Sequence, residues 1–275
     1  MKKNLINIIA AMLLIISSGC EDLNNPGEIK IKNSLFFNLQ VNSSRQHVYI
    51  YRNPDLSGRS DYYAADPFAN FFNKDAVVTL KETSGAQSTG FTLTQDTVDF
   101  SSFYSGYYSS PNPYKPYYTN SGVFEAKPLT DYYLSVNADG EIVTGKVTTP
   151  GDFNITSPRE GQVIRAAQNL DKFILSWSSS KNAMKYDVRI NFVDAYFKEP
   201  VWFSFGTADT SIVFKSLGLN SKGIASGGCI LQIVAFDDNY IQHYYNKKEI
   251  VGLSGAYGCF SSSVVREVRF RYVSD

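Results

Sequence analysis

The sequence predicts an all-β fold built from two tandem β-sandwich domains, and three observations lead to this expectation. After residue 20, no segment shows a long apolar period of 3.6 residues, the pattern typical of an amphipathic helix. Short runs of alternating apolar and polar residues recur instead, separated by residues that favour turns. Tyr and Phe are abundant, with 19 of each among 275 residues, and aromatic residues favour strands.

Residues 31–150 predict the first sandwich, which we expect to be Ig-like, and seven strands are its natural number. The expected strands lie at 35–41, 47–51, 76–80, 91–94, 122–126, 132–136 and 141–148. Asp139-Gly140 joins the last two as a hairpin turn, because both residue types tolerate positive φ. Residues 53–74 and 101–119 interrupt the spacing with aromatic insertions. Long loops of this kind are often functional.

Residues 151–275 predict the second sandwich, after a turn-rich boundary at 149–152. Its seven expected strands lie at 153–158, 173–177, 183–190, 201–205, 211–214, 229–236 and 264–273. Leu175-Ser176-Trp177 and Tyr186–Ile190 resemble the B and C strands of a fibronectin type III module, and Ile230–Asp237 resembles its F strand. This resemblance implies that the tryptophan lies in the core. Residues 238–261 depart from it as an insertion between the F and G strands.

The N-terminus has the layout of a secretory signal peptide. Lys2 and Lys3 precede an apolar run over residues 5–16, which is shorter than the roughly 20 residues that a membrane span needs. Small residues then lead to Cys20. This layout resembles a bacterial lipoprotein signal, in which cleavage before the cysteine is followed by lipid attachment. The resemblance implies a signal peptide at 1–19, a lipidated Cys20 and a tether at 20–30.

Features along the whole chain resemble the Bacteroidetes envelope lipoproteins grouped as domain of unknown function DUF4249. They are the lipobox, Asp75–Leu80, Ser121–Phe124, Tyr132–Val136 and Gly255–Phe260. Glu21 and Asp22 resemble the acidic tag that exports such lipoproteins to the outer face of the outer membrane. A solvated tether would look the same. The family resemblance implies an envelope location and supplies no activity.

Composition and motifs argue against several function classes. Without residues 1–19, 256 residues remain with 24 basic and 26 acidic side chains, a formal net charge of −2. Such a balance argues against nucleic-acid binding. The catalytic motifs with Gly-x-Ser-x-Gly, His-Glu-x-x-His or a phosphate-binding Gly-Lys-Ser/Thr do not occur. His47 and His243 do not form a Cys/His/carboxylate cluster with metal-ligand spacing. We therefore expect no enzyme, cofactor or metal.

A tyrosine-rich segment within residues 101–119 is the candidate ligand site. Its rings lie among Gly, Ser, Pro and Asn, a mixture that resembles a paratope and that also suits sugar rings. The alternative is that these rings pack against their own sandwich. The candidate residues are Tyr104, Tyr107, Tyr108, Tyr114, Tyr117 and Tyr118.

Cys229 and Cys259 are the two cysteines that remain after lipidation of Cys20. An exported compartment permits a disulfide. By the fibronectin-like assignment they flank neighbouring strands, so a cross-strand disulfide is geometrically possible. It would contribute about 3 kcal/mol. Two free buried thiols are the alternative.

Together these observations predict a lipid-anchored outer-membrane lipoprotein, exposed at the cell surface, that binds a glycan or an envelope protein. The alternative is an accessory or structural subunit of an envelope or transport complex. In either case the lipid on Cys20 would attach the chain to the membrane.

Overall fold

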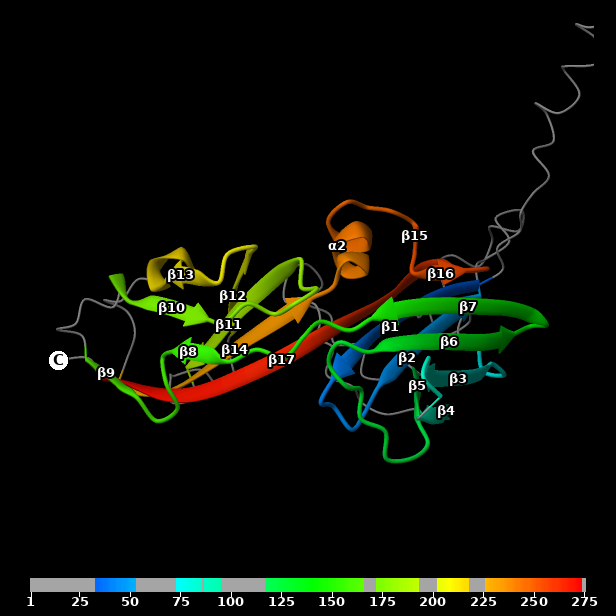
Figure 1. The fold of residues 1–275 in the computed structure, drawn as a ribbon, viewed down its shortest axis with the longest axis horizontal. Coiled ribbons are helices and arrows are strands. Elements are labelled where there is room, and N and C mark those ends of the chain that lie inside the picture. The colour runs from blue at the N-terminus through cyan, green and yellow to red at the C-terminus, as the bar shows by residue number, and fades with distance from the viewer. Residues whose placement is uncertain are drawn as a thin grey trace, which may run out of the picture. The chain divides into compact units, whose positions relative to one another are not determined.

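The computed structural model describes residues 33–52, 73–85, 87–94, 117–165, 172–192, 202–217 and 226–273. The predicted signal peptide and tether lie outside these ranges. Within them, strands dominate, with one short α-helix and one 3-10 turn. The all-β fold class is therefore confirmed by the structure itself (Figure 1).

The first half of the chain forms seven strands. They are β1 (Asn33–Val41), β2 (His47–Arg52), β3 (Val77–Glu82), β4 (Ser88–Thr94), β5 (Tyr117–Asn120), β6 (Asp131–Ala138) and β7 (Glu141–Thr148). Burial alternates without a break along β1, as the period-two pattern predicts. Asp139 and Gly140 have φ of 54° and 77° in the β6–β7 turn, so the predicted hairpin is confirmed.

Two expectations in this half are wrong. The predicted strand at 122–126 makes only an isolated bridge between Val41 and Ala126. The predicted loop at 101–119 instead ends in β5, which pairs with β2 and β4. The aromatic residues at the end of this segment alternate too weakly to mark a strand. The two neighbouring strands supply the hydrogen-bonding partners that define it.

The second half of the chain forms two layers around its own core. One layer has the order β12-β11-β14-β17 and the other β13-β10-β8. Trp177 of β10 is 3% exposed and packs edge-on against Tyr186 of β11, as the fibronectin-like pattern implies. The elements are β8 (Ile155–Ser157), β9 (Val163–Arg165), β10 (Ile174–Trp177), β11 (Lys185–Phe192), β12 (Trp202–Thr207), β13 (Ser211–Val213), η5 (Phe214–Leu217), β14 (Gly227–Phe236), α2 (Asp238–Tyr244), β15 (Ile250–Val251), β16 (Leu253–Ser254) and β17 (Tyr257–Val273).

The long strand β17 contributes to both halves. Residues 257–264 pair in parallel with β1, and residues 263–272 pair antiparallel with β14. Phe260 belongs to the core formed with β1–β7, called here the N-terminal core. Phe270 belongs to the core around Trp177, called the C-terminal core. Figure 1 shows β17 as one continuous red strand. The predicted insertion at 238–261 therefore contains α2, β15, β16 and the part of β17 that completes the N-terminal core.

Two residues adapt this part of the chain to its close contacts. Gly258 has a φ of 110°, and a Cβ there would collide with the carbonyl oxygen of Leu35 on β1. Only glycine adopts such a backbone without strain. Asp237 is the N-cap of α2, where it accepts a hydrogen bond from the Tyr240 amide at 2.9 Å. It also accepts bonds from the Ser262 amide and hydroxyl, at 2.7 and 2.8 Å, which tie α2 to β17.

Candidate functional site

The candidate tyrosines of the aromatic insertion divide into two groups. Tyr104, Tyr107, Tyr108 and Tyr114 lie outside the described residues. Tyr117 and Tyr118 are 3% and 2% exposed on β5, so the expectation that these two contact a ligand is wrong. The Tyr118 hydroxyl donates to the carbonyl of Asn73 at 2.8 Å and accepts from the amide of Ala76 at 2.9 Å. The Tyr118 ring lies in the hydrophobic core of its own half and the Tyr117 ring packs against His47, which is the alternative that the sequence left open.

The predicted disulfide between Cys229 and Cys259 is wrong, because neither cysteine is disulfide-bonded and both are buried. Cys229 lies opposite Phe270 on β17, and Cys259 lies eleven residues before Phe270 on the same strand. At about 3.3 Å per residue, the two cysteines are separated by about 36 Å, whereas a disulfide needs Cα atoms within about 7 Å. The sequence placed Cys259 just before the last strand, but that strand begins before it.

The remaining sequence candidates give no chemical centre. Among the described residues, no group of three His, Cys, Asp or Glu side chains is placed to hold a metal ion. His47 packs against the Tyr117 ring at 4.5 Å, and Nδ1 of His243 lies 2.7 Å from the Lys248 carbonyl oxygen. Cys20 lies outside the described residues. In the described ranges, no helix has the length and apolar character needed to cross a membrane.

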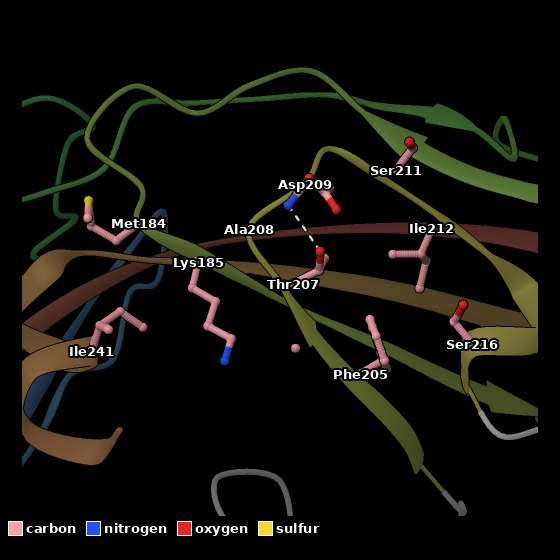
Figure 2. A pocket seen from close by; sticks show the side chains of 11 residues that line it. Met184, Lys185, Phe205, Thr207, Ala208, Asp209, Ser211, Ile212, Ser216 and Ile241 are labelled. Carbon is pink, nitrogen blue, oxygen red and sulfur yellow. Dashed lines mark hydrogen bonds between the residues drawn. The ribbon is translucent and has the colours of Figure 1, made fainter. Parts of the chain in front are cut away.

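A hollow of about 630 Å³ in the second half of the chain is the candidate functional site. This edge hollow, as we call it, is lined by residues of β11, β12, β13, η5 and α2, and by the turn between β12 and β13. Its volume falls within the roughly 300–1,000 Å³ of ligand sites. Figure 2 shows Lys185, Phe205 and Asp209 among its lining side chains. A second groove, beside Arg189 and Tyr244, has about 160 Å³ and falls below that range.

Two opposite charges, Lys185 and Asp209, lie at the edge hollow. The Lys185 ammonium lies 3.5 Å from the centre of the Tyr245 ring, a cation–π contact. Asp209 is exposed, and its backbone amide donates to the Thr207 hydroxyl at 3.0 Å. Within the described ranges, neither Lys185 nor Asp209 forms a salt bridge. A ligand that carries both signs of charge could therefore pair with both side chains.

Exposed apolar side chains line the same hollow as these charges. Phe205 is 38% exposed and Met184 is 55% exposed, and both line the edge hollow. Tyr245, which is 49% exposed, holds the Lys185 ammonium over its ring. Aromatic residues and Met are enriched at protein interfaces. The composition of the edge hollow thus suits a partner surface better than a small catalytic cleft.

Because Gly206 has no side chain, the Lys185 side chain can lie against it. A Cβ at Gly206 would lie 2.9 Å from Cε of Lys185 and 3.4 Å from the hydroxyl oxygen of Tyr245. Any larger residue would push the lysine out of its present position. Gly206 therefore gives a means of perturbing the edge hollow without altering the core.

Sequence reasoning missed the edge hollow, because its residues come from five elements and a turn. One local signal was present. Residues 202–207 read Trp-Phe-Ser-Phe-Gly-Thr, a strand pattern in which large aromatic residues are not confined to one face. Such a strand either has both faces covered or exposes aromatic surface. The structure shows exposure at Phe205.

The comparisons with known proteins give weak structural likeness only. No family model matches this sequence, and no curated protein is similar to it. The crystal structure of chicken CNTN1 FN1–FN3 domains matches with 11% identity and a TM-score of 0.23, over 88% of this chain and 65% of that one. The calcium-binding domain CBD12 of CALX1.1 matches with 9% identity and a TM-score of 0.21, over 86% and 99%. At these scores neither likeness supports an argument about what the chain binds.

Proposed function

We propose that this chain is a lipid-anchored interaction protein of the bacterial outer membrane, facing the cell surface and lacking catalytic activity. The observation that carries the binding role is the edge hollow, where exposed Phe205 and Met184 line the same surface as Lys185 and Asp209, two charges without a salt bridge in the described ranges. Exposed apolar side chains with flanking charges are the composition of a protein interface. The resemblance to DUF4249 lipoproteins and the cysteine at position 20 support the location.

Crosslinking in intact cells tests the binding role. A photoreactive phenylalanine analogue replaces Phe205 at the edge hollow, and the matched control replaces Val77, which is 64% exposed on β3. Binding at the edge hollow predicts discrete adducts from position 205 and none from position 77. Adding Gly206→Val, which displaces Lys185, should reduce the adducts about tenfold, as expected for the loss of roughly 1.4 kcal/mol of binding energy. Equal adducts from both positions would contradict the proposal.

The identity of the crosslinked protein separates two roles. A protein or glycoconjugate from outside the cell supports a surface receptor. Adducts that contain an integral outer-membrane protein in a fixed ratio instead support the alternative, an accessory subunit of an envelope complex. In both cases the edge hollow is the contact surface.

Fractionation tests the anchor. Cys20→Ala should prevent lipid attachment and release the chain from the membrane fraction or leave its signal peptide uncleaved. Protease treatment of intact cells, read with an antibody against residues 226–273, should remove the wild-type signal. Membrane attachment that survives Cys20→Ala would refute lipidation, and protection from protease would place the protein on the periplasmic face.

A further inference from the structure

The strand β12 lies at one end of the large sheet. Its partner in the described part of the chain is β11, in the antiparallel register that places Phe205 opposite Val188. In such a strand every second residue directs its backbone N–H and C=O away from the sheet. An edge of this kind is a template on which another strand can pair. The edge hollow lies along the same strand, because Phe205, Gly206 and Thr207 line it.

β12 differs from the other strands at sheet ends. β16, at the opposite end of the large sheet, has two residues, and β13 and β8, at the ends of the small sheet, have three each. Short strands are one of the devices that protect sheet edges from added strands. β12 has six residues, and its sequence contains neither a charged residue nor a proline. Of the sheet ends in the described ranges, β12 is therefore the longest strand, and η5 contacts part of it.

The charges of the edge hollow specify what the added strand carries. Lys185 and Asp209 both line the hollow and lack an ionic partner in the described ranges. If a second copy of this chain paired through its own β12, the added strand would supply no charged side chain. A foreign strand with an acidic and a basic side chain on one face can neutralise both residues. Side chains on one face of a strand recur at every second residue, so the two charges would be separated by an even number of positions.

From these observations we infer that the partner of the edge hollow is an extended peptide segment, which adds to β12 as a further strand and presents one acidic and one basic side chain to Lys185 and Asp209. Main-chain hydrogen bonds to β12 provide the affinity, and the hollow selects the side chains on one face. This inference rests on the proposed function, because it names the chemistry of the partner at the same site.

The test uses the mature chain and a panel of synthetic eight-residue peptides. The peptides alternate valine and threonine and carry one glutamate and one lysine, separated by two, four or six positions. Binding is followed by amide chemical shifts in ¹⁵N-labelled protein and by hydrogen exchange. A bound peptide should shift the amides of Ser204–Gly206, protect from exchange the alternate ones that point away from β11, and leave those of β3 unchanged.

Peptide N-methylation separates strand addition from other binding. A strand at an edge pairs through alternate residues, so methylating one alternate set of amides should weaken binding at least about tenfold. Methylating the other set should have little effect. Lys185→Glu should weaken binding by a similar factor, and exchanging the peptide's glutamate for lysine should restore it. Phe205→Lys places a charge on the edge and should block binding, whereas Val77→Lys should not.

Four outcomes would overturn the inference. If both N-methylated sets bind as well as the parent peptide, the hollow binds its ligand without strand addition. If no peptide binds although position 205 still crosslinks in cells, the partner is not an extended strand, and the proposed function stands alone. If the protein sediments as a dimer that Phe205→Lys dissociates, the occupant is a second copy. Absence of both peptide binding and crosslinks would refute the proposed function as well.

Discussion

Phe260→Ala tests whether β17 makes the two cores unfold together. The Phe260 side chain is fully buried in the N-terminal core and stacks on Phe37 with 5.1 Å between ring centres. Its ring also lies against Gly145, which has no side chain to fill the space that the mutation leaves. Removal of a buried phenylalanine costs about 3–5 kcal/mol, and we expect about 4 here. With a urea m-value of about 2.5 kcal/mol/M, the midpoint should fall by about 1.5 M.

Tryptophan fluorescence reports on the other core. Trp177 is buried in the C-terminal core, and Trp202 belongs to β12, which pairs with β11 of the same half. Fluorescence and far-UV circular dichroism are followed in urea on the chain without residues 1–19, with Cys20→Ala. If β17 couples the cores, Phe260→Ala shifts both signals equally. Ile142→Ala, at a position that is 67% exposed, should change the free energy of unfolding by less than about 0.5 kcal/mol.

Separate transitions for the two signals would show that the two cores unfold independently. A fluorescence midpoint equal to that of the wild type, with a circular dichroism transition at lower urea, would mean that the N-terminal core unfolds alone. β17 would then be a shared strand without energetic coupling. The prediction of two independent sandwich domains would in that case be the better description.

Three further predictions concern single sites. Gly258→Val places a side chain against the backbone of β1 and should lower the free energy of unfolding by more than about 2 kcal/mol. Gly122→Ala adds its side chain in open space and should change that free energy by less than about 0.5 kcal/mol. Thermal unfolding of both variants measures the difference. Burial raises the pKa of Asp237 from 3.8 to about 7, so the folded state holds this proton more tightly. The contribution of Asp237 to the free energy of unfolding should be fully present below about pH 4 and should fall by up to about 4 kcal/mol as pH rises through 7. Asp237→Asn should remove this contribution from the pH profile, and an unchanged profile would contradict it. Cys229 and Cys259 should resist iodoacetamide at pH 8 in the native state, since both are buried and burial raises the pKa of Cys259 to about 12. Both should react in denaturant. A proteolytic peptide pair linked by a Cys229–Cys259 disulfide would contradict their separation.

The strands of the fold could be predicted because their signal is local. Alternation of period two marks β1, β6 and β7 within a few residues of their bounds. Asp139-Gly140 marks their turn by backbone preference alone. β5 escaped prediction because four residues that follow a Pro- and Tyr-rich segment carry little periodic signal. Its identity as a strand depends on β2 and β4 on either side.

The candidate site could not be predicted in the same way. The tyrosines at 117 and 118 have the composition of a binding loop, but burial of their rings is a property of the surrounding core. Conversely, no sequence pattern marks Lys185 or Asp209, and Phe205 is marked only by the aromatic run at 202–207. They become a candidate site because the end of the sheet leaves β12 unpaired on one side in the described part of the chain.

By itself, the sequence determined the all-β class, the likeness of its N-terminus to a lipoprotein signal and the near-neutral charge that argues against nucleic acid. Each of these depends on neighbouring residues or on composition. The tertiary structure decided that β17 pairs with β1, more than 200 residues away along the chain, and that the cysteines are too far apart to bond. It also decided which strand ends the sheet. These properties depend on pairing between distant segments, and strand alternation states which face is buried without stating which partner covers it.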